Sequence, residues 1–122
     1  MSGGGVWTDA SSREVKENIA ELTAEQALAA LKDLTPVKFN YKANSSEKHV
    51  GFIAEDVPDL VASTDRKGLS PMDIVAVLTK AVQDQQKVVD GQQKVIEELR
   101  EKQRYMTALE ERLRVLESRA KE

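Results

Sequence analysis

An α+β fold is predicted, in which a small helix-plus-β-hairpin N-terminal part precedes a long C-terminal helix that forms a trimeric coiled coil. Three observations predict it. Capping boxes and apolar residues at helical spacing occupy the first part of the chain. Apolar and polar residues then alternate over residues 37–41, which is typical of a strand. From Pro71 to Glu122 no further proline interrupts a pattern with a seven-residue repeat.

Length and composition limit what the chain does. It has 122 residues, with 18 Lys plus Arg against 21 Asp plus Glu, one His and no Cys. A chain this short makes one modest domain. The absence of Cys excludes disulfides and thiolate sites, and one imidazole excludes a histidine metal centre, so we expect no cofactor and no metal. No apolar run is long enough to span a bilayer, and no secretion signal is visible.

Three segments are expected along the chain. Residues 1–10 begin with a Gly-rich stretch and are predicted to be a linker and residual upstream segment. Residues 11–70 form the small α+β part. Residues 71–122 form the trimerisation helix, which has no core of its own.

Two capping boxes predict helical segments. The first, at residues 11–14, pairs a Ser hydroxyl with Glu14 and predicts a short helical turn through Ile19 and Leu22. The second, at residues 23–26, opens a longer helix that ends before Pro36. The apolar residues of this second helix recur at three- and four-residue spacing and are Ala27, Leu28, Leu31 and Leu34.

Beyond Pro36 the apolar period changes from helical to strand-like. Val37, Phe39 and Tyr41 alternate with polar residues and predict a half-buried strand. Residues 49–54 are predicted to be its hairpin partner, and residues 55–61 a helical turn and a loop. Two strands alone are marginally stable, so we expect another element or another copy to cover the hairpin.

The long helix is expected to have Ser70 as its N-cap and Pro71 at its first position, and it carries a heptad pattern. Beyond Met106 the apolar spacing changes by a three-residue stammer, which overwinds a supercoil locally. The a positions hold Val75, Val82, Val89, Ile96 and Gln103, the d positions hold Leu78, Gln85, Gln92, Leu99 and Met106, and the g positions include Ala81, Val88 and Val95.

This apolar stripe is wider than a dimer requires and favours three strands. The glutamines at a and d positions, Gln85, Gln92 and Gln103, either select the register and the number of strands or simply lie in a partly solvated interface. Residues 72–122 carry ten acidic and ten basic side chains, so the helix is neither a basic arm for nucleic acid nor a one-sided membrane helix. Its expected partner is itself, as a homotrimer.

Three blocks in a fixed order carry a resemblance to a known family. They are residues 16–19 (KENI), residues 34–42 (LTPVKFNYK) and residues 49–61 (HVGFIAEDVPDLV), ahead of a Gln-rich helix. In this order they resemble the C-terminal intramolecular chaperone domain of endosialidases, phage tail spikes and tail fibres, over residues 11 to about 93. The resemblance implies a domain that trimerises, assists folding of an upstream fibre domain of the same polypeptide, and then cuts itself free.

By position, the resemblance implies a Ser/Lys dyad with Ser11 as nucleophile and Lys16 as base. The family commonly has Asp or Asn after the serine, whereas this chain has Ser12. On one regular helix Ser11 and Lys16 would lie about 140° apart, so either Ser11 precedes the helix or the pair forms between subunits. Ser12 is the alternative nucleophile, because it would neighbour Lys16 on a helix. The structural alternatives are a capping Ser11 and a solvated Lys16.

Further candidates are weaker. His49 is either a hydrogen-bonded strand residue or a group that orients the cleavage loop. Trp7 belongs either to the fibre shaft or to the cleaved strand. The acidic residues at 55, 56 and 59 form either a metal site or a solvated loop, and we expect the loop.

Two other function classes compete with a self-cleaving chaperone. One is a trimeric structural or binding module at a fibre tip that does not cleave. The other, a hydrolase acting on external substrates, is disfavoured because no Gly-rich phosphate loop, paired-carboxylate site or cofactor fingerprint is present. The resemblance places the protein in a virion tail fibre, or in the host cytoplasm during assembly.

Overall fold

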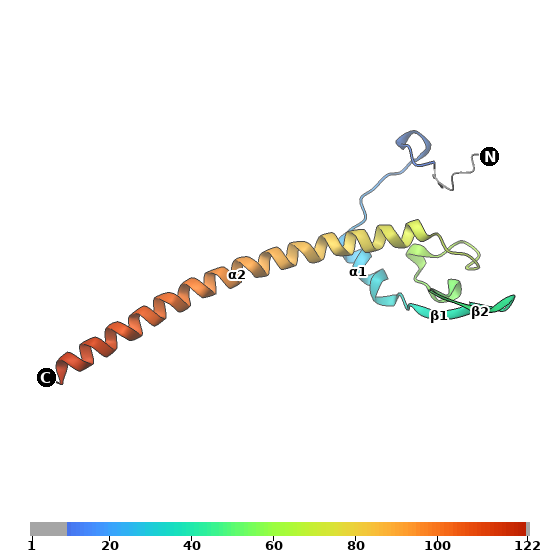
Figure 1. Cartoon of the computed structure of the whole chain (residues 1–122). Helices are drawn as coiled ribbons and strands as arrows, with labels where there is room; N and C mark the ends of the chain where they lie inside the picture. The colour runs from blue at the N-terminus through green and yellow to red at the C-terminus, as the bar shows by residue number, and fades with distance from the viewer. Residues whose placement is uncertain (1–9, 122) are drawn as a thin grey trace, which may run out of the picture.

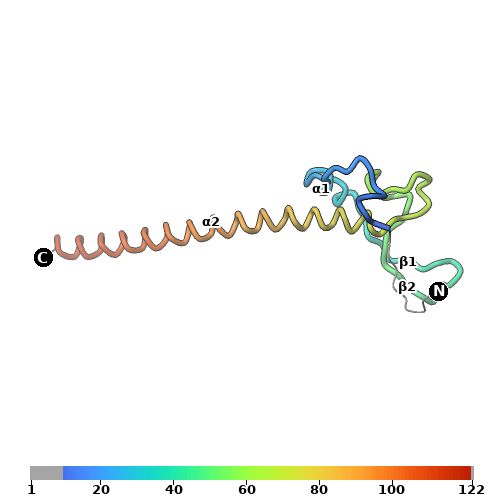
Figure 2. The backbone as a smooth tube through the Cα atoms, turned by 90° about the horizontal axis from the view of Figure 1, so that it is seen from above, coloured from blue at the N-terminus to red at the C-terminus, as the bar shows by residue number. Residues whose placement is uncertain are grey.

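The computed structural model describes residues 10–121. Its short elements gather at one end of a long helix, whose remaining length projects away from them as a single rod (Figure 1). Seen from above, no other part of the described chain runs beside the far half of this rod (Figure 2). The α+β fold class is therefore confirmed. In chain order the elements are η1 (Arg13–Val15), α1 (Ala24–Asp33), β1 (Val37–Tyr41), β2 (Asn44–Gly51), η2 (Ala54–Asp56), η3 (Asp59–Val61) and α2 (Pro71–Ala120).

Helix α1 starts at the predicted capping box. The backbone N–H of Gln26 donates to Oγ1 of Thr23 at 3.1 Å, and the backbone N–H of Thr23 donates to Oε1 of Gln26 at 3.1 Å. The helix ends at Asp33, and Leu34 has already left the helical conformation ahead of Pro36. Both ends lie where the local signals predict them.

The core lies where α1, the segment of η2 and η3, and the first turns of α2 meet. The largest side chains that are fully buried are only those of Val61 and Val77. A buried valine contributes about 1.5–3 kcal/mol, so this core provides modest stabilisation for a chain of this length. The buried members of the cluster are Ala27, Ala30, Val57, Val61, Ile74 and Val77.

Strands β1 and β2 form a two-stranded antiparallel sheet. Val37 pairs with Gly51 and Phe39 pairs with His49, and the register shifts between Phe39 and Tyr41. The Phe39 ring lies over Gly51, where an added Cβ would stand 3.2 Å from the ring edge. Glycine at this position therefore allows the aromatic side chain to approach the neighbouring strand.

The second strand differs from its prediction. It occupies Asn44–Gly51, whereas residues 49–54 were the predicted partner of β1. Residues 44–48 are exposed, so they show no apolar alternation. Asn44 pairs with Tyr41, and residues 45–48 lie opposite the register shift in β1. Beyond Gly51 the chain turns away into η2, and Val57, which follows this turn, is part of the core.

The loop from 62 to 69 is tied back onto the η2–η3 segment by one side chain. Arg66 has a positive φ of 53° and directs its guanidinium at this segment. It donates to the carbonyl oxygen of Val57 at 2.9 Å and forms an ion pair with Asp59. Arg66 thus fixes the segment that carries the buried Val57 and Val61 on its exposed side, while the core packs against the two valines on the other.

Helix α2 has 50 residues, which corresponds to about 75 Å. Its N-cap residue is Ser70 and proline opens the first turn, as predicted, although the Ser70 hydroxyl makes no capping hydrogen bond. Only Ile74, Val77 and Ala81 are buried, all in the first turns. Among the described residues, no helix has an apolar stretch long enough to cross a membrane.

Apart from Ala81, which is buried, the apolar heptad positions of α2 are exposed, with exposed fractions from 41% at Ile96 to 60% at Val82. We call this set the heptad stripe. An exposed apolar stripe of this length on one helix is typical of a surface that packs against a partner. The heptad stripe consists of Val75, Leu78, Val82, Val88, Val89, Val95, Ile96, Leu99 and Met106.

Candidate catalytic site

The first predicted capping box forms a single 3-10 turn, η1. Its N-cap is Ser12, whose Oγ accepts from the backbone N–H of Glu14 at 3.2 Å. Two backbone bonds close the turn, from Val15 N–H to the Ser12 carbonyl and from Lys16 N–H to the Arg13 carbonyl, each at 3.2 Å. At Lys16 the backbone is extended again, with φ −117° and ψ 148°.

The predicted helical turn through Ile19 and Leu22 is not formed. Asn18 has a φ of 52°, in the left-handed region, which a right-handed helix does not tolerate. The capping residue is Ser12 and not Ser11. Residues 16–23 instead run without helical structure toward α1, and η1 stands away from the other short elements (Figure 1).

This local geometry brings Ser11 and Lys16 together. The Lys16 Nζ donates to the Ser11 Oγ at 2.7 Å. Ser11 lies before the turn, which is the first of the two arrangements that the spacing allowed. The two side chains can meet across η1 because a single 3-10 turn between non-helical residues is tighter than a turn of an α-helix. The Ser12 hydroxyl meanwhile accepts from the Glu14 amide.

Both members of the pair are exposed in the single chain. Val15, which precedes Lys16, and Ile19, three residues beyond it, are 66% and 55% exposed. Lysine acts as a general base only in its neutral form, which burial or a neighbouring cation favours. In the single chain the contact between Ser11 and Lys16 is exposed to solvent.

His49 lies in an aromatic cluster on the hairpin. Its ring stacks on Phe39 at a centroid distance of 5.7 Å and meets the edge of Tyr41 at 5.2 Å. The hairpin and η1 lie on opposite sides of α2 in Figure 1. Within one chain, the structure does not bring His49 to Ser11 and Lys16. Trp7, the other candidate near the cleavage point, lies outside the described residues.

The acidic candidates do not converge. Asp59 forms the ion pair with Arg66, and within residues 10–121 no group of three or more potential ligands surrounds a metal position. A different carboxylate, Asp65, accepts from the Lys67 backbone N–H at 3.0 Å and from the Ser63 hydroxyl at 2.9 Å. These two hydrogen bonds lower the pKa of the Asp65 carboxyl below its usual value.

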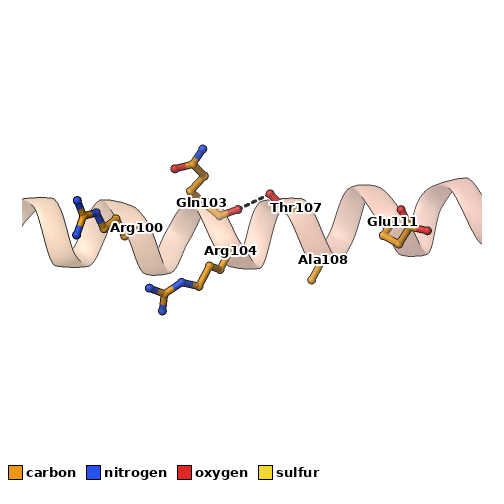
Figure 3. Close-up of a pocket in the computed structure, with 6 residues that line it drawn as sticks. All are labelled: Arg100, Gln103, Arg104, Thr107, Ala108 and Glu111. Carbon is orange, nitrogen blue, oxygen red and sulfur yellow. Dashed lines mark hydrogen bonds between the residues drawn. The ribbon is translucent and has the colours of Figure 1, made fainter.

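A hollow on the distal part of α2 offers no alternative site. Figure 3 shows its six lining residues, all of which project from this one helix. The one hydrogen bond among them runs from the Thr107 hydroxyl to the Gln103 carbonyl, 2.9 Å away within the same helix. The hollow is the surface of an uncovered helix.

Comparison with known proteins agrees with the resemblance stated above. The family model described as chaperone of endosialidase matches residues 11–65. This span begins at Ser11 and includes Lys16, α1, the hairpin and both following 3-10 turns. The match confirms the resemblance over these residues and supports an intramolecular chaperone role, while α2 lies outside it. No curated protein and no solved structure matches the chain significantly.

Proposed function

We propose that this chain is a C-terminal intramolecular chaperone that trimerises, assists folding of an upstream fibre or tail-spike segment, and then releases itself by cleavage next to Ser11. The observation that carries the cleavage is the 2.7 Å contact between Lys16 Nζ and Ser11 Oγ, inside the span that matches the family. Residues 1–10 are the linker to the client, residues 11–70 the processing part, and residues 71–122 the trimerisation helix.

The heptad stripe supports the trimer. Its additional apolar g positions make the surface wider than the narrow seam of a two-stranded coil, with which the β-branched a positions alone are also compatible. In its first turns α2 packs against the small core through Ile74, Val77 and Ala81, and Ala81 is itself a g position. Beyond Ala81 no described residue of α2 is buried, so the heptad stripe beyond it is open to other copies of the chain.

Trimerisation provides the chaperone mechanism. Three helices that associate hold the three upstream segments close together, so contacts between those segments become effectively intramolecular. The small α+β part lies at the start of α2 (Figure 1). In this proposal it joins the rod to its client. This arrangement fits the assembly of a trimeric tail fibre, in the virion or in the host cytoplasm.

The cleavage chemistry requires only the two side chains, a peptide bond and water. A neutral Lys16 amine takes the hydroxyl proton as Ser11 Oγ attacks the carbonyl carbon of a peptide bond next to Ser11. The C–N bond breaks, and the leaving nitrogen receives the proton from the Lys16 ammonium. Water then hydrolyses the resulting ester and restores the hydroxyl, so no metal or cofactor takes part.

Assembly is the step that activates the pair in this proposal. In the single chain Lys16 donates to Ser11, and both side chains are exposed to solvent. Val15 and Ile19, close to Lys16 in the chain, are exposed apolar side chains on which a neighbouring copy would pack and so exclude water from this segment. Cleavage would then follow trimerisation and not precede it.

The test is a fusion with a small reporter domain placed before Met1. Wild type is expected to release a C-terminal fragment of the domain's mass, while Ser11→Ala and Lys16→Met remain intact on a denaturing gel. Ser45→Ala is the matched control, because Ser45 is exposed in β2. Equal cleavage in Ser11→Ala and wild type would refute Ser11 as nucleophile.

A second candidate, a trimeric fibre-tip module that does not cleave, is favoured by the solvent exposure of the pair. The same fusion separates the two proposals. A wild-type fusion that forms trimers and stays intact supports the fibre-tip module.

A further inference from the structure

The turn that brings Lys16 to Ser11 depends on very few contacts. Three hydrogen bonds define it: the Glu14 N–H to the Ser12 Oγ, the Val15 N–H to the Ser12 carbonyl, and the Lys16 N–H to the Arg13 carbonyl. Among the described residues, no bond between backbone groups links η1 to another element. A single helical turn is unstable by itself, because it fixes several dihedral angles for few hydrogen bonds. Its formation therefore depends on local capping.

Ser12 provides that cap with its side chain. Its backbone has the extended conformation of an N-cap residue, with φ −64° and ψ 147°, and its Oγ satisfies the Glu14 amide. The same residue provides the carbonyl that receives the Val15 N–H. Ser12 thus contributes to two of the three hydrogen bonds that reverse the chain between Ser11 and Lys16.

We propose that Ser12 is a positioning residue, whose side-chain cap on η1 holds the Lys16 amine against the Ser11 hydroxyl. This inference rests on the cleavage proposed above and adds a role for a residue that the spacing offered only as a rival nucleophile. What the position requires is a short side chain with a hydrogen-bond acceptor, and not a hydroxyl as such. Asn meets that requirement because it caps helices as well as Ser, whereas Ala does not.

The two roles of Ser12 give opposite results for one substitution. If Ser12 caps the turn, Ser12→Ala slows cleavage of the reporter fusion and Ser12→Asn cleaves at nearly the wild-type rate. If Ser12 is the nucleophile, both variants stay uncut. The loss expected for Ala is about fivefold in rate, because a cap contributes about 1 kcal/mol and 1.4 kcal/mol corresponds to tenfold.

The measurement is the time course of fragment release by wild type, Ser12→Ala and Ser12→Asn over a range of pH. The midpoint of the pH profile is expected to be the same in all three, since capping changes how often the pair is formed and not the chemistry of the amine. Ser45→Ala again serves as the control. An unchanged rate in Ser12→Ala, or equal slowing in Ser12→Ala and Ser12→Asn, overturns the inference.

A second readout does not require cleavage. Amide hydrogen exchange at Glu14 and nuclear Overhauser contacts between the Lys16 side chain and the Ser11 β-protons report the turn directly. Wild type and Ser12→Asn are expected to show slow exchange and the contacts, and Ser12→Ala to lose both. If the wild-type fusion stays uncut but Ser12→Ala alone loses the turn, the cleavage proposal is refuted and the positioning role of Ser12 stands. If the Glu14 amide exchanges at the same rate in wild type and Ser12→Ala, the positioning role is refuted.

Discussion

Replacing Leu99 by Asp separates self-association from the fold of the single chain. Leu99 occupies a d position of α2 and is 57% exposed. It lies far from the buried part of the helix, which is confined to Ile74, Val77 and Ala81. An aspartate at this position therefore leaves the small core intact and acts only where a partner helix would cover it.

The magnitude follows from the area that the partner covers. Full burial of a leucine contributes about 1.5–3 kcal/mol, and somewhat more than half of the Leu99 side chain remains to be buried. Three copies then lose about 3–5 kcal/mol of association free energy, before the cost of placing three carboxylates together in the seam. This corresponds to a trimer weakened at least a hundredfold, and about a thousandfold at the middle of the range.

Sedimentation equilibrium measures the result. Wild type is expected to have three times the chain mass at micromolar concentration, and Leu99→Asp to have the mass of one chain. Helix α1 is expected to remain folded in both proteins. Gln83→Asp is the matched control, because it adds the same charge at an exposed position of α2 outside the stripe. A Leu99→Asp variant as fully trimeric as wild type, or a monomeric wild type, refutes the reasoning.

Two further predictions concern the loop that follows η3. Arg66→Ala is expected to lower the free energy of unfolding by about 1 kcal/mol, because the bond to the Val57 carbonyl is lost while the exposed ion pair with Asp59 contributes little; thermal unfolding measures it, and a stability equal to that of wild type contradicts it. The pKa of the Asp65 carboxyl is lowered in the folded loop, so its contribution is present above the usual value of 3.8 and disappears as pH falls through the lowered pKa. The Lys67 amide is expected to lose its hydrogen bond over that acidic range, as followed by its chemical shift, and Asp65→Asn to remove this transition; a Lys67 shift that titrates equally in both proteins contradicts the assignment.

Elements with strong local signals were predictable. The reciprocal capping of Thr23 and Gln26 and the proline at 36 set both ends of α1, and the start of α2 follows from Ser70 and Pro71. The strand Val37–Tyr41 was evident from alternation, because one of its faces is partly covered. By contrast, the exposed residues 44–48 carry no such pattern, and they lie in β2 beside the register shift of the hairpin, where Asn44 pairs with Tyr41.

For the candidate site, the spacing of the residues limited which serine could meet Lys16 but did not select one. It required Ser11 to precede any helix if it was to meet Lys16 within one chain, and it left Ser12 as a rival. What it missed is the left-handed Asn18 and the brevity of η1, so the helix expected through Leu22 was wrong. Asparagine tolerates positive φ better than most residues, which was the available signal.

By itself, then, the amino-acid sequence determined α1 with both of its ends, strand β1, the start of α2 and the apolar heptad stripe, because capping, proline geometry and periodicity act over a few residues. Only the tertiary structure decided that Arg66 closes a loop onto η2 and η3, that the core consists of small side chains around Val61 and Val77, and that the stripe remains uncovered in one chain. These features depend on which segments distant in sequence pack together and on how much surface area each contact buries. No local sequence pattern specifies the contacts or the buried area.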